Sequence, residues 1–174
     1  MSEKFIIPPR TTDGNEIRKF FLNVCQYING MMETKNSLAS VYSGTSQTGL
    51  TSGVATKINL DTEIYDIGGN FASYKFTAPV TGYYSAKWSA YMASDGGTLT
   101  GGLSYLYKDG ASIVYGSYAS AINGYMVSSG SKDVYMVAGT YLEVYALGIT
   151  SSSTWQIRPG FQGTFLTVHL IARS

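Results

Sequence analysis

The side chains that could carry catalysis or bind a metal are few in this sequence. It contains one cysteine, Cys25, and one histidine, His169. A single cysteine excludes an intrachain disulfide and a multi-cysteine zinc site, and a single histidine excludes a histidine-based metal cluster. His169 would also have to serve any Ser-His-Asp triad, yet it lies in an apolar run near the C-terminus. Because the sequence has no nucleophile elbow, phosphate-binding glycine loop or zincin motif, we expect no enzyme.

Asp61, Glu63 and Asp66 form the one cluster of acidic residues in the chain. At strand spacing Asp61 and Glu63 would share a face, where they could bind calcium together with backbone carbonyls. Calcium needs about six or more oxygen ligands, so we favour a solvated strand edge. We therefore expect no cofactor and keep calcium as the alternative.

Composition narrows the function classes further. Of 174 residues only 13% are charged, 14% are aromatic, about a third are Gly, Ser or Thr, and the formal net charge is +1. The aromatic content is enough to bury a core. The balanced charge lacks the basic excess of nucleic-acid-binding proteins, and no apolar run approaches the length of a membrane span. The first ten residues also lack the apolar core of a secretory signal, so we expect neither membrane insertion nor conventional secretion.

Charge density divides the chain into two parts. Residues 1–36 carry nine charged side chains, whereas residues 37–174 carry fourteen over a much longer stretch. Such a shift marks a boundary, which we place near Asn36. The sequence thus predicts an N-terminal segment, 1–36, followed by a head domain, 37–174.

The N-terminal segment is predicted to begin extended and to continue as a helix. Pro8 and Pro9 disfavour helix at the start. Asp13 offers an N-cap oxygen, and Glu16 follows three positions later, as in a capping box. A helix is therefore expected from about Gly14 to Glu33.

One face of this helix has the spacing of a heptad seam. The seam consists of Ile17, Phe21, Val24, Ile28 and Met31. Steps of four and three residues are typical both of an amphipathic helix that packs on its own domain and of a short coiled coil. Two heptads alone are too short for a stable coiled coil, but they could form a stalk if a neighbouring domain already joined the chains. Both interpretations stay open.

From Leu38 onward the hydrophobic period changes to two. The clearest strand-like runs are 74–77, 83–92, 103–107, 112–118, 134–137, 141–147 and 165–171. Breaks rich in Gly, Ser and Asp separate them, among them Ser128–Ser131. Asp109 and Gly110 between two strand formers predict a tight hairpin. About eight to ten strands without an intervening helix predict an antiparallel sandwich or jelly roll.

Several of these strands are apolar or aromatic on both faces. In the run 141–147, one face carries Leu142, Val144 and Ala146, and the other carries Tyr141, Glu143, Tyr145 and Leu147. A sandwich needs only one apolar face per sheet. The second face must be covered, and another copy of the chain is the simplest cover.

Two motifs and their order resemble a known family. The first, F-x5-G-x-Y, contains Phe76, Gly82 and Tyr84, and the second, F-x-G-x-x-L, contains Phe161, Gly163 and Leu166. Between them lie a strand with its turn, 104–110, and a glycine-containing segment, 137–144. Together these resemble the complement C1q globular-head family, whose members are relatives of the tumour necrosis factor fold, over about residues 38–174.

The resemblance implies an all-β, ten-stranded antiparallel jelly roll that assembles as a homotrimer. The six motif residues are then expected to determine the fold or the trimer, and we interpret Phe161 as a core residue. Heads of this kind bind proteins, glycans or other surfaces and generally do no chemistry. A trimer would also bring three N-terminal helices together, as a stalk requires.

Low charge and a Tyr/Ser/Gly-rich composition suit a protein that works outside cells without a conventional secretory signal. A virion protein meets this description, because it is made in the host cytoplasm and released with the particle. We therefore expect a phage fibre, spike or tail component that attaches to other virion proteins through its N-terminal segment. The alternatives are a purely structural capsid decoration or head fibre protein and a non-viral extracellular ligand-binding module.

If the head binds a host-surface protein or glycan, loops rich in small residues are the expected contact surface. Such loops let the backbone approach a ligand, and aromatic rings in them offer stacking faces. The ring residues expected to do this are Tyr118, Tyr125 and Trp155.

Overall fold

The computed structural model describes residues 13–35, 38–122, 124–151 and 154–174, with helix side chains described as far as residue 28. Contacts within the chain define two compact units, Met1–Asn36 and Ser37–Ser174. The expected extended segment around Pro8 and Pro9 lies outside the described residues.

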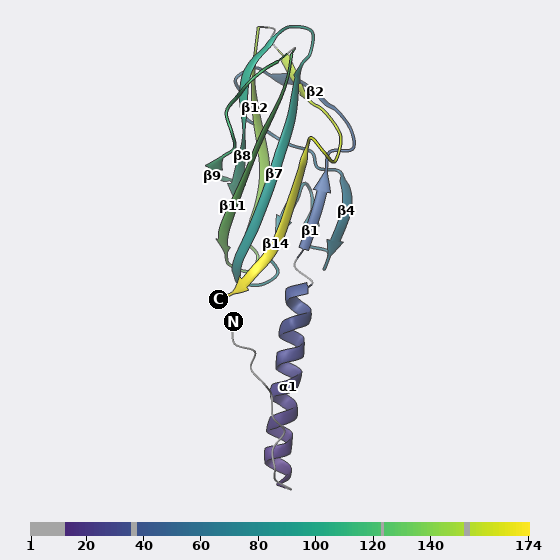
Figure 1. Ribbon diagram of the computed structural model, residues 1–174, viewed down its shortest axis with the longest axis vertical. Helices are drawn as coiled ribbons and strands as arrows, with labels where there is room; N and C mark the ends of the chain where they lie inside the picture. The colour runs from purple at the N-terminus through teal and green to yellow at the C-terminus, as the bar shows by residue number, and fades with distance from the viewer. Residues whose placement is uncertain (1–12, 36–37, 123, 152–153) are drawn as a thin grey trace. The chain divides into compact units, whose positions relative to one another are not determined.

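The first unit contains one helix, α1 (Gly14–Lys35) (Figure 1). It begins where the sequence predicts, because the Asp13 carboxylate accepts a hydrogen bond of 2.9 Å from the backbone N–H of Asn15, which is an N-cap. Glu16 lies in the first turn, where a negative charge stabilises the positive end of a helix, and it pairs with Lys19 at 3.4 Å. Among the described residues, no helix has both the length and the apolar character that a membrane crossing requires.

The second unit is built from two antiparallel sheets. Sheet A consists of β1 (Leu38–Tyr42), β2 (Gln47–Thr51), β4 (Thr62–Ile67), β7 (Gly82–Ser94), β11 (Tyr125–Met136), β13 (Thr154–Ile157) and β14 (Phe165–Arg173). Its central strand is β7, which pairs with β11 along one edge and with β14 and then β13 along the other. Beyond β14 the sheet continues through β1 to β4 (Figure 1).

Sheet B has β8 and β12 at its centre. It consists of β3 (Thr56–Lys57), β5 (Phe71–Ala72), β6 (Lys75–Thr77), β8 (Leu99–Lys108), β9 (Ala111–Tyr115), β10 (Ala119–Ser120) and β12 (Tyr141–Thr150). The strands β9 and β10 pair with one edge of β8, and β3 and β6 pair with the outer edge of β12. The two sheets together form the sandwich.

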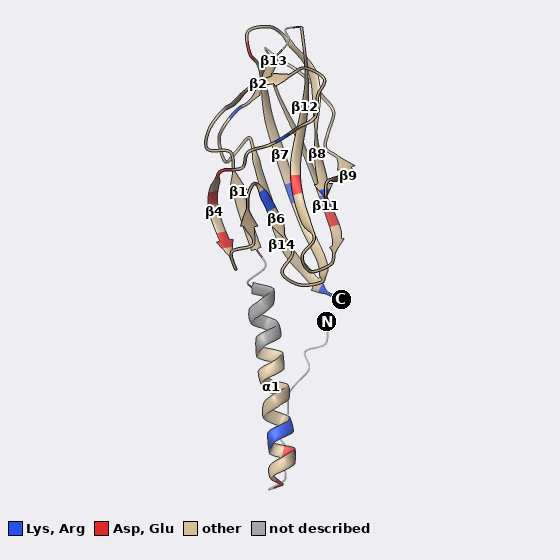
Figure 2. Cartoon of the chain, turned by 180° about the vertical axis from the view of Figure 1, so that it is seen from behind, with Lys and Arg blue, Asp and Glu red and all other residues tan. Residues whose placement is uncertain are grey.

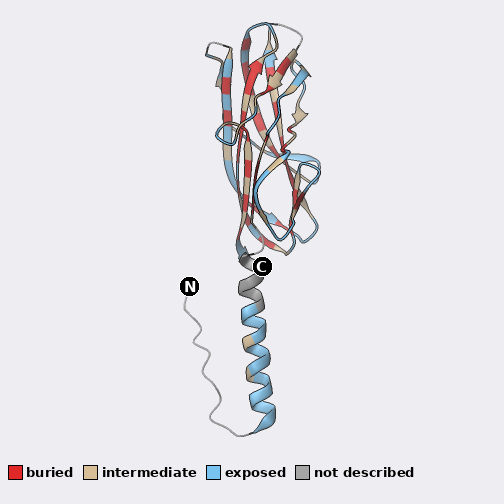
Figure 3. Ribbon diagram, turned by 90° about the vertical axis from the view of Figure 1, so that its right-hand side faces the viewer, coloured by how far each residue is buried: buried red, intermediate tan, exposed pale blue. Residues whose placement is uncertain are grey.

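The predicted all-β antiparallel sandwich with a short N-terminal helix is confirmed. Every pairing among the described strands is antiparallel. The described residues form fourteen strands where ten were expected, because short segments such as β3, β5 and β10 add two-residue pairings at the sheet edges. Buried and exposed residues alternate along the long strands, as a sandwich requires (Figure 3).

The core lies between the sheets and is rich in large aromatic side chains. Trp88 and Trp155 are fully buried, and Phe76 and Tyr84 meet there with ring centroids 5.6 Å apart. The buried Tyr84 hydroxyl donates a hydrogen bond of 2.8 Å to the carbonyl oxygen of Val80. Phe76, Tyr84 and Leu166 are thus core residues, as their motifs predict.

Phe161 is an exception, and its interpretation as a core residue is wrong. It lies in the turn between β13 and β14 with 58% of its surface exposed, and its ring packs edge-on against Tyr42 at 6.3 Å. The nearby Gly163 is a point of close approach between the turn and β7, because a Cβ atom there would lie 3.0 Å from Tyr91. The motif therefore specifies the path of the turn and not a buried ring.

The expected break at Ser128–Ser131 is also wrong, because these residues lie inside β11. Ser128 is buried, and its hydroxyl accepts a hydrogen bond of 2.7 Å from the backbone N–H of Ser104. A Cβ atom on Gly130 would overlap the Trp88 ring. Small residues occur here because a tryptophan occupies the space beside the strand, not because the chain turns.

The hairpin predicted at Asp109 and Gly110 is confirmed. Both residues have positive φ, 50° and 81°, and they join β8 to β9. This geometry is that of the two-residue turns that match strand twist. The Asp109 carboxylate also accepts a hydrogen bond of 2.9 Å from the backbone N–H of Tyr141, which ties the turn to β12.

Candidate functional site

Two of the three residues of the acidic cluster, Asp61 and Asp66, each bind a neighbouring turn, whereas Glu63 is exposed. The Asp61 carboxylate accepts hydrogen bonds from the backbone N–H of Gly44 and the Thr45 hydroxyl, at 2.5 and 2.6 Å. The Asp66 carboxylate accepts two from the backbone of Asn70 and Phe71. Because the two carboxylates bind different turns, they do not converge on one point. Over the described residues, no group of three or more His, Cys, Asp or Glu side chains could hold a metal ion.

The charge state of Asp61 follows from these contacts. Partial burial opposes its ionisation, but the hydrogen bonds from Thr45, Gly44 and Thr62 outweigh that effect. Together they hold the pKa of Asp61 below its ordinary value. The carboxylate is therefore charged at neutral pH and is used as an acceptor in a turn.

The three ring residues expected to bind a ligand have different environments. Tyr118 is 64% exposed. Tyr125 is also exposed, but it lies on β11, where its ring is 5.9 Å from that of Tyr91 and carries the Arg158 guanidinium at 5.8 Å. Trp155 is fully buried, and its indole N–H donates a hydrogen bond of 2.9 Å to the carbonyl oxygen of Thr51. The prediction of Trp155 as a surface contact is therefore wrong.

The outward face of sheet A is aromatic or apolar at its two ends, whereas its middle carries polar and charged residues such as Lys87, Ser131 and Asp133. At one end Tyr83 and Tyr135 lie opposite each other, with ring centroids 5.3 Å apart. At the other end a hollow of about 400 Å³ is lined by Tyr91, Val127 and the turn 159–163, which includes Phe161. An exposed apolar surface of this kind marks an interaction site.

The apolar seam of α1 is exposed in the single chain. Ile17, Phe21 and Ile28 have between 36% and 60% of their surface accessible, and Val24 is half-buried. The side chain of Met31, the last seam residue, lies outside the described residues. The described part of the seam thus offers a stripe to which another helix could bind.

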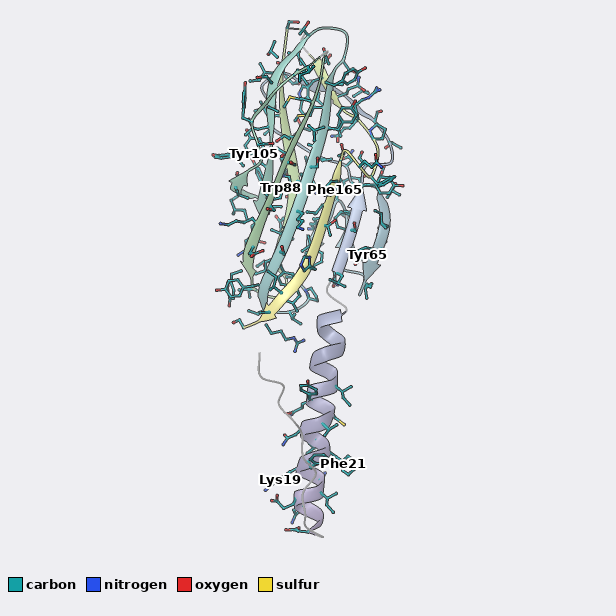
Figure 4. The ribbon with its side chains drawn as sticks, viewed as in Figure 1. Lys19, Phe21, Tyr65, Trp88, Tyr105 and Phe165 are labelled. Carbon is teal, nitrogen blue, oxygen red and sulfur yellow. The ribbon has the colours of Figure 1, made fainter. Side chains whose placement is uncertain are left out.

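The outward face of sheet B carries a cluster of tyrosines that the sequence analysis did not single out. Tyr105 and Tyr107 come from β8, Tyr115 from β9 and Tyr145 from β12, and these four residues are called the tyrosine platform below. The rings of Tyr107 and Tyr145 are stacked at 4.1 Å. Tyr105, which Figure 4 labels, contacts Tyr107 at 6.2 Å and Tyr115 at 5.4 Å. The sequence could have predicted part of this cluster from the spacing of Tyr105 and Tyr107, because residues two apart in a strand lie on the same face.

The head has little charge, as the small number of blue and red segments on its strands shows (Figure 2). A few charged residues border the platform. The Lys57 ammonium pairs with the buried Glu143 carboxylate at 2.6 Å and donates a hydrogen bond of 2.9 Å to the carbonyl oxygen of Ser73. The Lys75 ammonium lies 4.4 Å from the centre of the Tyr141 ring, a cation–π contact. Among the described residues, Lys75 has no carboxylate partner.

Burial raises the pKa of the Tyr105 hydroxyl, and the neighbouring Tyr107 and Tyr115 add to the effect. For Tyr145 burial is again the largest cause, followed by the negative charge of Glu143. Both hydroxyls therefore keep their protons to higher pH than a free tyrosine does, and remain hydrogen-bond donors over the whole physiological range.

These shifts predict how stability depends on alkaline pH. The unfolded chain loses the two protons first, near the ordinary tyrosine pKa of about 10, so stability falls as pH rises above that value. Phenolate absorbance should show a late-titrating fraction that shrinks in Tyr105→Phe, and denaturant unfolding of the wild type should be easier at about pH 11 than at about pH 9. A Tyr105→Phe variant with an undiminished late fraction would contradict the assignment.

Comparison with known proteins finds similarity in structure but not in sequence. No family model matches the chain, and none of the curated proteins matches its sequence. Among solved structures, Eiger, a tumour necrosis factor from S. frugiperda, is similar with a TM-score of 0.58 and 10% identity, over 79% of this chain and 93% of that one. The globular domain of zebrafish complement 1qA gives a TM-score of 0.56 and 14% identity over 79% and 99%. Murine APRIL at pH 8.5 gives 0.54 and 12% over 78% and 98%.

At these identities the similarity concerns the fold alone. The similar proteins include a tumour necrosis factor and a complement 1q domain, which are the two groups that the sequence motifs indicate. The chain therefore has the jelly-roll fold of the tumour necrosis factor and C1q type.

Proposed function

We propose that this chain is a non-enzymatic homotrimeric virion protein, a phage fibre, spike or tail component whose head binds a host-surface receptor or glycan. It is made in the host cytoplasm and acts on the virion, where its N-terminal segment binds other virion proteins. The proposal requires no cofactor, no nucleic-acid contact and no membrane insertion.

The observation that carries the trimer is the outward face of sheet A. Tyr83, Val127 and Phe161 are between 47% and 58% exposed on or beside this face in the single chain. Covering such a surface with two further copies removes apolar area from water at about 25 cal/mol per Å². The fold supports the same arrangement, since the resemblance to C1q heads implies three sandwiches around an axis.

The helix supports a stalk in the same assembly. A seam that is too short to form a coiled coil alone gains stability when a trimeric head raises the local concentration of the helices. The virion assignment is drawn from composition, because a low-charge, Tyr/Ser/Gly-rich chain suits a particle surface.

The trimer predicts a solution mass of about three times 18.8 kDa in light scattering. Val127→Lys, which places a charge beside the apolar hollow of sheet A, is expected to reduce the mass to that of the monomer. Ile113→Lys is the matched control, because Ile113 is similarly exposed but lies on β9 of sheet B. A wild-type chain that is monomeric in dilute buffer would contradict the trimer and the stalk together.

The division of labour along the chain gives a separate prediction. Deleting Met1–Glu33 should leave a head that melts cooperatively and still associates, because most of the area buried between copies lies on the sandwiches. The shortened protein should no longer co-purify with particles that incorporate the full chain. Unfolded protein after the deletion would show that the helix belongs to the core of the head.

Host-cell binding by the labelled trimer tests recognition itself. Tyr118 and Tyr125 are the exposed loop and strand-end candidates for the contact, and their replacement with alanine should reduce binding without lowering the melting temperature. If wild-type trimers bind no host surface, the structural alternative, a capsid decoration or head fibre protein, replaces the adhesin. A gene neighbourhood without virion genes would favour the non-viral extracellular module.

A further inference from the structure

The tyrosine platform presents a continuous aromatic surface from three strands. Its rings contact one another in the order Tyr115, Tyr105, Tyr107 and Tyr145. The register explains the continuity, because both Tyr115 and Tyr145 lie directly opposite Tyr105 on the neighbouring strands. Tyr115 is 67% exposed and the other three are half-buried, so the rings offer their outer faces and edges to a ligand.

The hydroxyl groups of the platform are open to a ligand. Within the described part of the chain, none of the four forms a hydrogen bond to another residue, in contrast to the core residue Tyr84. Covering four hydroxyls with an apolar protein surface would leave them without partners, at a free-energy cost for each one. A ligand that itself carries many hydroxyl groups supplies those partners.

The polar border of the platform is held in place by the chain. Ser73 and Tyr74, the turn between β5 and β6, both have positive φ, 52° and 60°, which is uncommon for residues other than glycine. The carbonyl oxygen of Ser73 accepts a hydrogen bond from Lys57, and Glu143 neutralises the same ammonium. Lys75, held over the Tyr141 ring, forms no ion pair among the described residues, and the Asp109 carboxylate at the same border is bound by the backbone N–H of Tyr141.

From these features we infer that the outward face of sheet B binds a glycan that carries carboxylate groups. Tyrosine rings stack on the C–H faces of pyranose rings, and their hydroxyls exchange hydrogen bonds with sugar hydroxyls. The Lys75 ammonium complements a sugar carboxylate, since charge-assisted pairs are stronger than neutral hydrogen bonds. The inference rests on the proposed adhesin function and deepens it by naming the face and the ligand chemistry.

A second copy of the chain fits this face less well than it fits sheet A. Sheet A also exposes Tyr83, Tyr135 and Lys87. At its ends, however, it exposes Val127, Ile171 and Phe161, whose side chains have no polar atom that loses a partner when water is excluded. The platform has polar hydroxyls and a cation at its border. We therefore assign the contact between copies to sheet A and ligand binding to sheet B. A trimer then presents three copies of the platform, which increases the avidity of binding.

The test uses the full-length protein and a panel of carboxylated oligosaccharides, namely oligogalacturonate, oligoalginate and oligosialic acid, with dextran oligomers as the neutral probe. At least one acidic probe should bind in calorimetric titration, and dextran should bind at least about tenfold more weakly, as loss of one charge-assisted contact predicts. Tyr115→Ala and Lys75→Gln should each weaken acidic-glycan binding by about tenfold, and the affinity of Lys75→Gln should depend less on salt. Failure of all acidic probes, or equal binding of dextran, overturns the inference.

Tyr27→Ala is the control, because Tyr27 is also an exposed tyrosine, 49% against 67% for Tyr115, but lies on α1 and not in the head unit. The control should bind the glycan as the wild type does, and loss of binding in Tyr27→Ala with retention in Tyr115→Ala overturns the platform. Host-cell binding separates the two proposals. Cell binding that survives both platform variants overturns this inference and leaves the adhesin standing, whereas a wild type that binds the glycan but no host cell overturns the adhesin alone.

Discussion

Replacing Trp155 with alanine is expected to lower the free energy of unfolding by about 3 to 5 kcal/mol. Trp155 is fully buried on β13, and its ring lies so close to β12 that a Cβ atom on Gly148 would be 2.7 Å from it. The substitution leaves a cavity where the large ring lay, because a core relaxes only partly around a missing side chain, and it removes the hydrogen bond to Thr51. Denaturant unfolding followed by tryptophan fluorescence and circular dichroism measures the loss.

Phe161→Ala is the informative control for this prediction. Its ring is more than half exposed, so its truncation should change the stability of the isolated head by less than about 1 kcal/mol. If the trimer forms through sheet A, any further loss should depend on protein concentration, because it acts through association. A large, concentration-independent loss for Phe161→Ala, with a small loss for Trp155→Ala, would reverse the roles that the structure gives these residues.

Trp155 and Phe161 also show what the sequence could and could not predict. Both are aromatic residues near the end of the chain, and the surrounding Ser151–Thr154 and Pro159–Gly163 stretches are equally rich in small or turn-forming residues. Which ring points inward depends on the pairing of β13 with β7 and β2, a contact between segments more than fifty residues apart. Local composition carries no signal for such a pairing.

The long strands were predictable because their period is local. Alternation within β7, β8, β12 and β14 identifies the inward residues whatever the partner strand is. In β11 the same reasoning failed at Ser128 and Gly130, where composition is typical of a turn but the neighbouring Trp88 requires small residues. Intrinsic preferences there are outweighed by tertiary packing.

The tyrosine platform could be predicted only in part from the sequence. The sequence shows that Tyr141–Leu147 has two non-polar faces, and the interpretation assigned the second face to a partner copy. The structure instead places the Tyr145 ring against Tyr107 of the adjacent strand, so neighbouring rings already cover part of each other. Cross-strand register decides this. The Asp109–Gly110 turn sets the register of β8 with β9, whereas the long-range pairing of β8 with β12 brings Tyr145 to Tyr107.

Gly82→Val is expected to cost about 3 kcal/mol or to prevent soluble expression. A glycine is often required where φ is positive, but the φ angle of Gly82 is not positive. The constraint is space: a Cβ atom at this position would overlap the carbonyl oxygen of Ala172 and lie 2.9 Å from Leu170 Cδ1. Because Gly82 begins the central strand β7 and pairs there with both Met136 and Arg173, the strand cannot move aside without breaking two ladders.

Gly14→Val separates this steric cost from the general cost of losing a glycine. Gly14 begins α1, and no atom lies within 4 Å of the position that its Cβ would take, so the variant should melt as the wild type does. Gly82→Ala should lie between the two, since it meets the same carbonyl oxygen with a single methyl group. Equal melting temperatures for Gly82→Val and Gly14→Val would show that β14 yields at its end, and the close approach of β7 and β14 would then not determine the fold.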